Sequence, residues 1–353
     1  MAINLAEKWE KELDKLFTLG SLTDAWCGKD YTFDGVNAIK VRTLDPTPIN
    51  DYNTATTGVN RFGAYQDVGD TVQTLTLMNK KSFNAVFDAP DVQDTAFIRN
   101  AKEYLTQVWD EQMVPLIDEY RFKTWAENAG LSGYNTTKLT TDSVMEAILT
   151  GHAAMSNAKV PHTNRVTFIS ETLWIKARLA DALKYNPDWV SKTVVNGVVG
   201  TLSGSPIVTV PDSMLPAGVD FMLKYKNATV DAMKLKMLRV IEESENVAGQ
   251  LMQGLVRYDS FVLDKKASGL YVYGHENICT MPTFSTSSNA VTITKATGET
   301  VKYTTDGSNP KTSNTASTYS NAVAITKDTL FRAYAYKTGA VNSGIAEYNA
   351  IHT

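Results

Sequence analysis

The chain has 353 residues, of which 43% are hydrophobic and 20% are charged, as in folded globular proteins. This composition excludes a disordered or collagen-like chain, and at roughly 150 residues per domain the length suggests two or three domains. The 34 basic and 38 acidic residues give a net charge of −4, so general attraction to nucleic acid or anionic membranes is not expected. Because no apolar run approaches about 18 residues, we predict neither a membrane span nor a secretion signal.

The first residues have the pattern of a short amphipathic helix. Trp9, Leu13 and Phe17 lie on one apolar stripe of this helix, and Glu and Lys residues occupy its other face. Such a helix is marginal alone in water, so the stripe needs a partner surface. The break at Gly20 indicates that the next segment is not this partner. We therefore assign residues 1–36 to an N-terminal arm whose stripe contacts another subunit.

Residues 37–92 predict a long β-ribbon with a projecting loop. Apolar and polar residues alternate on both sides of the loop, which is typical of two long strands. The loop, residues 46–69, is rich in Pro, Asn, Thr and Gly and is too long for a simple connection in a compact domain. It carries the aromatic residues Tyr52, Phe62 and Tyr65. We expect these three side chains to contact another subunit.

A long helix and an α+β body are predicted for residues 93–279. Asp94 is a suitable N-cap, and the helical pattern continues to about Asn128, with Pro115 expected to kink it. At about 1.5 Å per residue this helix would be longer than a small domain is wide. Beyond it, helical and strand patterns alternate up to Tyr273.

The composition changes at Thr280, where Ser and Thr residues become dominant. Short alternating strands recur at roughly 8 to 12 residue spacing, which predicts a small all-β sandwich over residues 280–353. Because this domain is polar, we expect it on the outer surface, contributing little buried contact to the rest of the chain. Its Tyr319 and Tyr334 fit either packing within the sandwich or a weak surface contact to a glycan.

No catalytic, cofactor-binding or metal site is predicted. The four histidines form no metal-binding motif, and Cys27 and Cys279 lack the partners of a C-x-x-C pair or a disulfide framework. Acidic pairs such as Asp118-Glu119 are typical of solvated helix faces. We therefore expect a structural protein without enzymatic activity, made in a reducing compartment.

An amphipathic arm, a ribbon with a projecting loop, a long helix and an α+β body follow one another in this order. The succession resembles the major capsid protein of tailed double-stranded DNA bacteriophages, the Hong-Kong-ninety-seven-like fold that encapsulins share. In that family these parts are the N-arm, the E-loop, the spine helix, and the P and A domains. The resemblance covers about residues 1 to 275 and rests mainly on residues 49–52, 70–73, 113–118, 204–208, 257–266 and 269–272.

The tail resembles the immunoglobulin-like module of the chitobiase/β-hexosaminidase C-terminal type. In residues 303–310, Asp306-Gly307 supplies a turn and Pro310 ends a strand. The resemblance continues through residues 319–320, 329–339 and 342–343.

The resemblance to the capsid protein implies self-assembly. It implies a homo-oligomeric shell of pentamers and hexamers, the icosahedral head of a tailed bacteriophage, synthesised in the cytoplasm of the bacterial host. A separately encoded scaffolding protein and a portal are the implied partners, with packaged double-stranded DNA on the inner face. Independently of the resemblance, the arm stripe, the ribbon and the long helix would expose apolar surface in an isolated subunit, which is typical of obligate interfaces.

Two other functions stay open at this point. An encapsulin-like protein nanocompartment would use the same fold to enclose a cargo enzyme. A carbohydrate-active enzyme is suggested by the tail alone, but a glycosidase needs two carboxylates at a fixed separation in a cleft, and no segment places such a pair.

Overall fold

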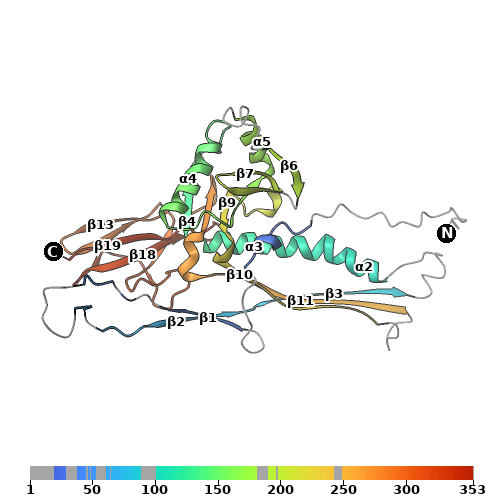
Figure 1. Cartoon of the computed structure of the whole chain (residues 1–353), viewed down its shortest axis with the longest axis horizontal. Helices are drawn as coiled ribbons and strands as arrows, with labels where there is room; N and C mark the ends of the chain where they lie inside the picture. The colour runs from blue at the N-terminus through green and yellow to red at the C-terminus, as the bar shows by residue number, and fades with distance from the viewer. Residues whose placement is uncertain are drawn as a thin grey trace, which may run out of the picture.

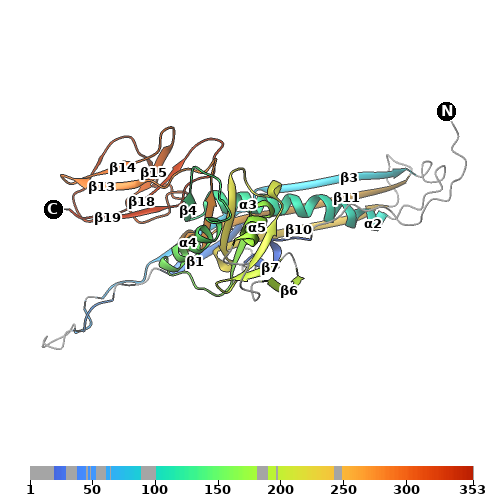
Figure 2. The same ribbon diagram turned by 90° about the horizontal axis from the view of Figure 1, so that it is seen from above.

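A computed structural model describes most of the chain: residues 20–28, 38–44, 47, 49–52, 61–63, 65–88, 101–180, 190–195, 198–241 and 249–352. An elongated rod of helix and sheet carries a compact domain above it, a projecting β-ribbon below it and a C-terminal β-domain at one end (Figure 1, Figure 2). The predicted arm residues Trp9, Leu13 and Phe17 and the predicted N-cap Asp94 lie outside the described residues.

The long helix is continuous but changes its winding in the middle. It comprises α2 (Ala101–Val108), a π-helical turn η2 (Trp109–Met113) and α3 (Val114–Asn128). In the π turn, the N–H of Val114 donates to the carbonyl of Trp109, five residues back. In an α-helix the ring of Pro115 would clash with the carbonyl four residues back, and the wider turn directly before it relieves this clash. The irregularity predicted at Pro115 is therefore a π turn.

The projecting ribbon consists of β1 (Ala38–Leu44) and β2 (Asp70–Thr76), paired antiparallel from Ala38–Thr76 to Leu44–Asp70. The next strand, β3 (Asn79–Asp88), leaves the ribbon and pairs with β11 (Gly249–Val262) in a different sheet. The prediction of one ribbon over residues 37–92 is wrong for β3. The reason is that Leu77 is buried and the N–H of Met78 donates to Asp259 Oδ2 at 2.8 Å, which anchors the chain in the body between β2 and β3.

A three-stranded antiparallel sheet runs beneath the long helix (Figure 1). Its central strand β11 (Gly249–Val262) lies between β3 and β10 (Thr229–Ile241). Apolar side chains of the helix pack on β11: Leu105 on Met252, and the Met113 and Ile117 pair on Val256 and Tyr258. Helix and sheet together form the rod.

The compact domain is built on a seven-stranded mixed sheet. Its central strands β5 and β9 are buried along nearly their whole length, as the sequence predicted for residues 165–169. One face packs against α3 through Phe122 and Trp125, and the other packs against α4 and α5. In sheet order the strands are β4 (Leu131–Tyr134), β12 (Leu270–Gly274), β9 (Val219–Tyr225), β5 (Arg165–Ser170), β8 (Ser205–Val210), β7 (Val198–Leu202) and β6 (Val190–Val195), and the helices are α4 (Val144–Asn157) and α5 (Glu171–Leu179).

The C-terminal residues form the predicted all-β sandwich. Side chains of Phe284, Tyr303 and Phe331 pack between its two sheets. The sheets are β13 (Thr283–Ser287), β14 (Ala290–Thr294) and β17 (Val323–Ala324), and β16 (Ser317–Thr318), β15 (Thr300–Thr304), β18 (Thr329–Tyr336) and β19 (Ala346–Ala350). Short 3-10 turns complete the fold at η1 (Asp24–Trp26), η4 (Asp212–Met214), η5 (Lys226–Ala228) and η6 (Asp264–Gly269).

Candidate functional site: the arm joint and the ribbon tip

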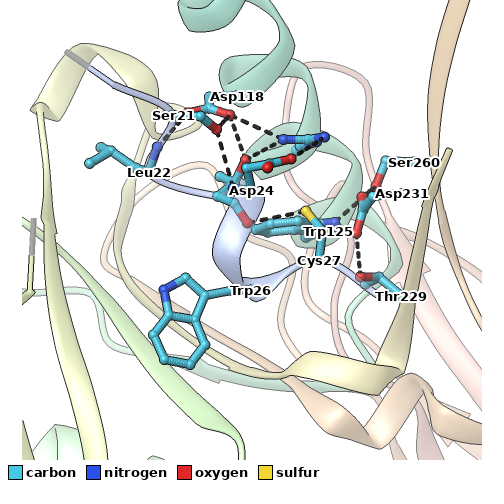
Figure 3. Close-up of polar contacts among 12 residues, drawn as sticks. Ser21, Leu22, Asp24, Trp26, Cys27, Asp118, Trp125, Thr229, Asp231 and Ser260 are labelled. Atoms are coloured by element: carbon cyan, nitrogen blue, oxygen red, sulfur yellow. Dashed lines mark hydrogen bonds and ion pairs between the residues drawn. The ribbon is translucent and has the colours of Figure 1, made fainter. Parts of the chain in front are cut away.

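Residues 20–28, the described end of the arm, are fixed to the rod. Leu22 and Cys27 are buried in the same apolar cluster as Phe122 and Trp125 of α3. Around this cluster a network of polar contacts joins the segment to the helix and to β10 and β11 (Figure 3). We call this network the arm joint.

The first half of the arm joint is centred on Asp118 of α3. Its carboxylate accepts hydrogen bonds from Ser21 Oγ (2.9 Å), the backbone N–H of Leu22 (2.8 Å) and the hydroxyl of Thr23. Arg121, one turn later, donates to Thr23 Oγ1 at 2.7 Å and lies 3.4 Å from Asp118 Oδ1. Asp118 is only 1% exposed, so the sequence-based interpretation of this acidic pair as a solvated face is wrong for Asp118. A buried carboxylate is stable only when it is paired and hydrogen-bonded, as here.

The second half is centred on Asp231 of β10. Its carboxylate accepts hydrogen bonds from the hydroxyls of Thr229 and Ser260, and Ser260 Oγ also accepts a bond from Trp125 Nε1 at 2.9 Å. The backbone N–H of Asp231 donates to the carbonyl of Gly28 at 3.2 Å. The end of the arm is therefore bonded to helix and sheet at once (Figure 3).

Lys224 of β9 connects the arm joint to the compact domain. Its Nζ donates to the carbonyl of Trp26 at 2.6 Å and lies 4.3 Å from the centre of the Trp125 ring. Burial lowers the pKa of Lys224. Burial, followed by the negative charge of Asp231, raises the pKa of the Cys27 thiol, which keeps this cysteine protonated and unreactive at neutral pH.

The far end of the ribbon has the opposite character, because its apolar side chains are exposed. Tyr52 is 51%, Phe62 81% and Tyr65 92% exposed. The rings of Tyr52 and Phe62 meet edge to face, with centroids 4.9 Å apart. Leu44 and Ile49 add further exposed apolar surface. A patch of this kind on a projecting ribbon is typical of an interaction surface; that it contacts another subunit stays a prediction.

The two tyrosines considered for glycan contact pack within the C-terminal domain. Tyr334 is 7% exposed, and Lys311 Nζ lies 5.5 Å from its ring centre. Tyr319 is half-buried, and its ring meets that of Tyr303 edge to face. Packing, the first of the two interpretations from the sequence, accounts for both positions.

The described residues contain no group of three or more His, Cys, Asp or Glu side chains placed to hold a metal ion. Within the same residues, no helix is long and apolar enough to cross a membrane. The half-buried His275 pairs with the buried Asp220, with Nδ1 and Oδ2 2.8 Å apart.

Sequence reasoning missed the arm joint, because its members are spread from Ser21 to Ser260 and form no motif. The local signal is the run Ser21-Leu22-Thr23-Asp24, in which short polar side chains flank a buried leucine. Nothing in the sequence indicates that Asp118 is the partner of this run.

Comparison with solved structures identifies the fold. The chain is similar to a structure of Mycobacterium phage Che8 (TM-score 0.60, 17% identity, 77% of this chain and 98% of that chain). It is also similar to the capsid structure of the cyanophage P-SCSP1u (TM-score 0.61, 13% identity, 77% and 93%) and to the mature capsid of bacteriophage PhiM1 (TM-score 0.55, 12% identity, 76% and 91%). The chain has the phage capsid fold. In the terms of that fold, the ribbon is the E-loop and the long helix is the spine helix.

Two further comparisons used the amino-acid sequence. The family model described as Fn3 associated matches residues 291–348, which lie in the C-terminal β-sandwich and fit an immunoglobulin-like module beside the capsid fold. A search of curated proteins finds no match to the chain.

Proposed function

We propose that this chain is the major capsid protein of a tailed double-stranded DNA bacteriophage. The observation that carries the proposal is the capsid fold, which the chain shares over 77% of its length with the cyanophage capsid structure. The role is structural and not enzymatic, and the protein is located in the virion after synthesis in the host cytoplasm.

Assembly into a homo-oligomeric shell follows from the exposed ribbon tip. Phe62 and Tyr65 lie in the loop between β1 and β2, where they are exposed in the single chain. Docking such tips, together with the arm residues Trp9, Leu13 and Phe17, on neighbouring subunits would bury on the order of 2,000 Å² or more, which is the obligate class of interface. Pentamers and hexamers are the arrangement that the resemblance to the capsid protein implies for such a shell.

The other partners follow from the same proposal. A scaffolding protein would set the curvature of the growing shell, and a portal would occupy one vertex. Packaged double-stranded DNA would face the inner surface, where exposed lysines such as Lys80 and Lys81 of β3 could bind phosphates.

Electron microscopy of the purified full-length chain, expressed with and without its candidate scaffolding protein, tests the proposal. We expect closed shells from the wild-type chain and only unassembled, folded subunits from a Phe62→Ser, Tyr65→Ser double variant. Ile351→Ser, which removes an exposed apolar side chain near the C-terminus, away from the ribbon loop in the sequence, is the matched control and should assemble. A wild-type chain that stays monomeric, or a double variant that assembles normally, would contradict the proposal.

The nanocompartment alternative predicts a different content for the same shell. Particles isolated from the natural source would contain an enzyme and no long DNA. Nucleic-acid absorbance of intact particles, together with mass spectrometry of their protein content, separates the two functions.

A further inference from the structure

The C-terminal module is bonded directly to the capsid-fold body. The N–H of Ile345 donates to the carbonyl of Gly130 at 2.7 Å, and the N–H of Gly344 donates to Ser132 Oγ at 2.7 Å. At Gly344 the two backbones are so close that an added Cβ would lie 2.7 Å from the nitrogen of Ser132. Figures 1 and 2 both show the module beside β4 and the end of α3.

Apolar side chains of the module complete the core of the body. Val341 and Ile345 are buried in the same cluster as Phe122 and Trp125. The expectation that this polar domain contributes little buried contact is therefore wrong. The overall Ser/Thr composition of the tail hides the few apolar residues that face the body.

Lys311 of the module binds the carboxyl end of the long helix. Its Nζ donates to the carbonyls of Glu127 (2.9 Å) and Ala129 (2.7 Å), and Asn342 Nδ2 donates to the Glu127 carbonyl at 3.2 Å. The last carbonyls of a helix have no partner within it, and the Lys311 amine supplies donors for them. Because α3 has no basic residue in its own last turn, the module supplies this cap.

A second anchor links the module to the base of the ribbon. The carboxylate of Asp264 in η6 accepts hydrogen bonds from Asn309 Nδ2 (3.0 Å) and Thr312 Oγ1 (2.6 Å) of the module. The backbone N–H of Asp264 donates to Gln73 Oε1 of β2 at 3.4 Å. One residue of the body therefore contacts both the module and the ribbon.

We propose that the C-terminal module is a brace of the subunit, which caps the carboxyl end of the long helix through Lys311 and ties it to the base of the ribbon through Asp264. On this view the module is part of the working body of the subunit and not a displayed attachment. The helix end, the ribbon base and the module move as one unit. The inference depends on the contacts of a single chain and is independent of the proposed function.

Hydrogen exchange of the full-length, unassembled chain tests the brace. Lys311→Met removes both bonds to the helix carbonyls, and Lys327→Met, at an exposed module position, is the matched control. We expect amides of residues 127–132 and 341–345 to exchange at least tenfold faster in Lys311→Met and at wild-type rates in Lys327→Met. Strands β15 and β18, inside the module, should keep their protection.

The result that overturns the proposal is unchanged exchange at residues 127–132 in Lys311→Met. Should that variant fail to fold, Asn342→Ala removes one donor to the Glu127 carbonyl. We expect hydrogen exchange in the same two segments to be about threefold faster in this variant. Unchanged exchange there would equally overturn the proposal. Asp264→Ala tests the second anchor: faster exchange in both residues 309–313 and 70–76 supports the link, and a change confined to the module contradicts it.

Discussion

The buried side chains of Asp118 and Arg121 carry opposite charges that stabilise each other. Asp118 accepts three hydrogen bonds from residues 21–23 and lies beside Arg121, and both side chains are shielded from water. A buried pair contributes little net stability compared with an apolar pair, but removing one partner leaves the other charge uncompensated.

We expect Asp118→Ala to lower the free energy of unfolding by about 3–5 kcal/mol, because Arg121 loses its buried partner and the three donors of residues 21–23 lose their acceptor. The exposed Asp24, 3.7 Å from Arg121, compensates the charge less well. The adjacent Glu119 is exposed, so Glu119→Ala should change stability by less than about 0.5 kcal/mol. Urea denaturation of the unassembled subunits measures both. Equal effects from the two variants would show that the arm joint contributes no specific stability.

The brace residue Lys311 should give the subunit a measurable pH dependence. Burial lowers its pKa to about 7, and the negative charge of Glu127 opposes this effect. In the unfolded chain lysine keeps its proton up to about pH 10.4, so unfolding takes up a proton above pH 7 and stability rises with pH. Between about pH 7 and 8.5 the buried thiols of Cys27 and Cys279 do not oppose this effect, since their raised pKa values matter only above the unfolded thiol pKa of about 8.5. Lys224, whose pKa burial also lowers, contributes a slope of the same sign that Lys311→Met leaves in place.

Thermal unfolding across that window provides the measurement. The wild-type and Lys327→Met chains should gain stability as the pH rises, whereas Lys311→Met should gain less. A Lys311→Met chain with the wild-type pH slope would assign the slope to other groups.

At the scale of elements, the arm joint depends on close approach between two backbones. A Cβ added at Gly28 would lie 2.3 Å from the carbonyl oxygen of Thr229, whereas at Gly20 nothing lies within 4 Å. Gly28→Ala should therefore push residues 20–28 away from β10 and cost about 1–3 kcal/mol. Gly20→Ala should be close to neutral. Hydrogen exchange at residues 22–28 reports the loosening directly, and wild-type protection in Gly28→Ala would contradict it.

The sequence predicts a helix or strand best where its apolar residues repeat with one helical or strand period. The helix at residues 144–157, the buried strand at 165–170 and the strands of the sandwich follow from apolar spacing alone. The departure of β3 from the ribbon depends instead on a distant pairing, the hydrogen bond from the N–H of Met78 to Asp259. Local patterns carry no record of such pairings.

The two parts of the candidate site, the ribbon tip and the arm joint, differ in how well the sequence predicts them. The aromatic residues of the ribbon tip could be singled out because Phe62 and Tyr65 stand in a long polar loop, and they are exposed there. Their contact with another subunit stays a prediction. The arm joint could not, since Asp118 looks like any surface acid until Arg121 and residues 21–23 are placed around it. The module's role was misjudged because composition averages over the few residues that form its contact.

At the scale of the whole molecule, the described chain behaves as a body with a stabilising module, and truncation should reveal the dependence. Ending the chain after Tyr273 removes Ile278, Val341 and Ile345 from the core that holds Phe122 and Trp125, and leaves the last carbonyls of α3 without their cap. Losing three apolar side chains at about 1.5–3 kcal/mol each would remove most of the stability of an ordinary domain.

We therefore expect the chain truncated after Tyr273 to aggregate or unfold, whereas a chain that lacks only residues 351–353 should stay folded. Circular dichroism and size-exclusion chromatography distinguish these outcomes. A truncated chain that is soluble, melts at the wild-type temperature and still forms shells would show that the module is an attachment after all.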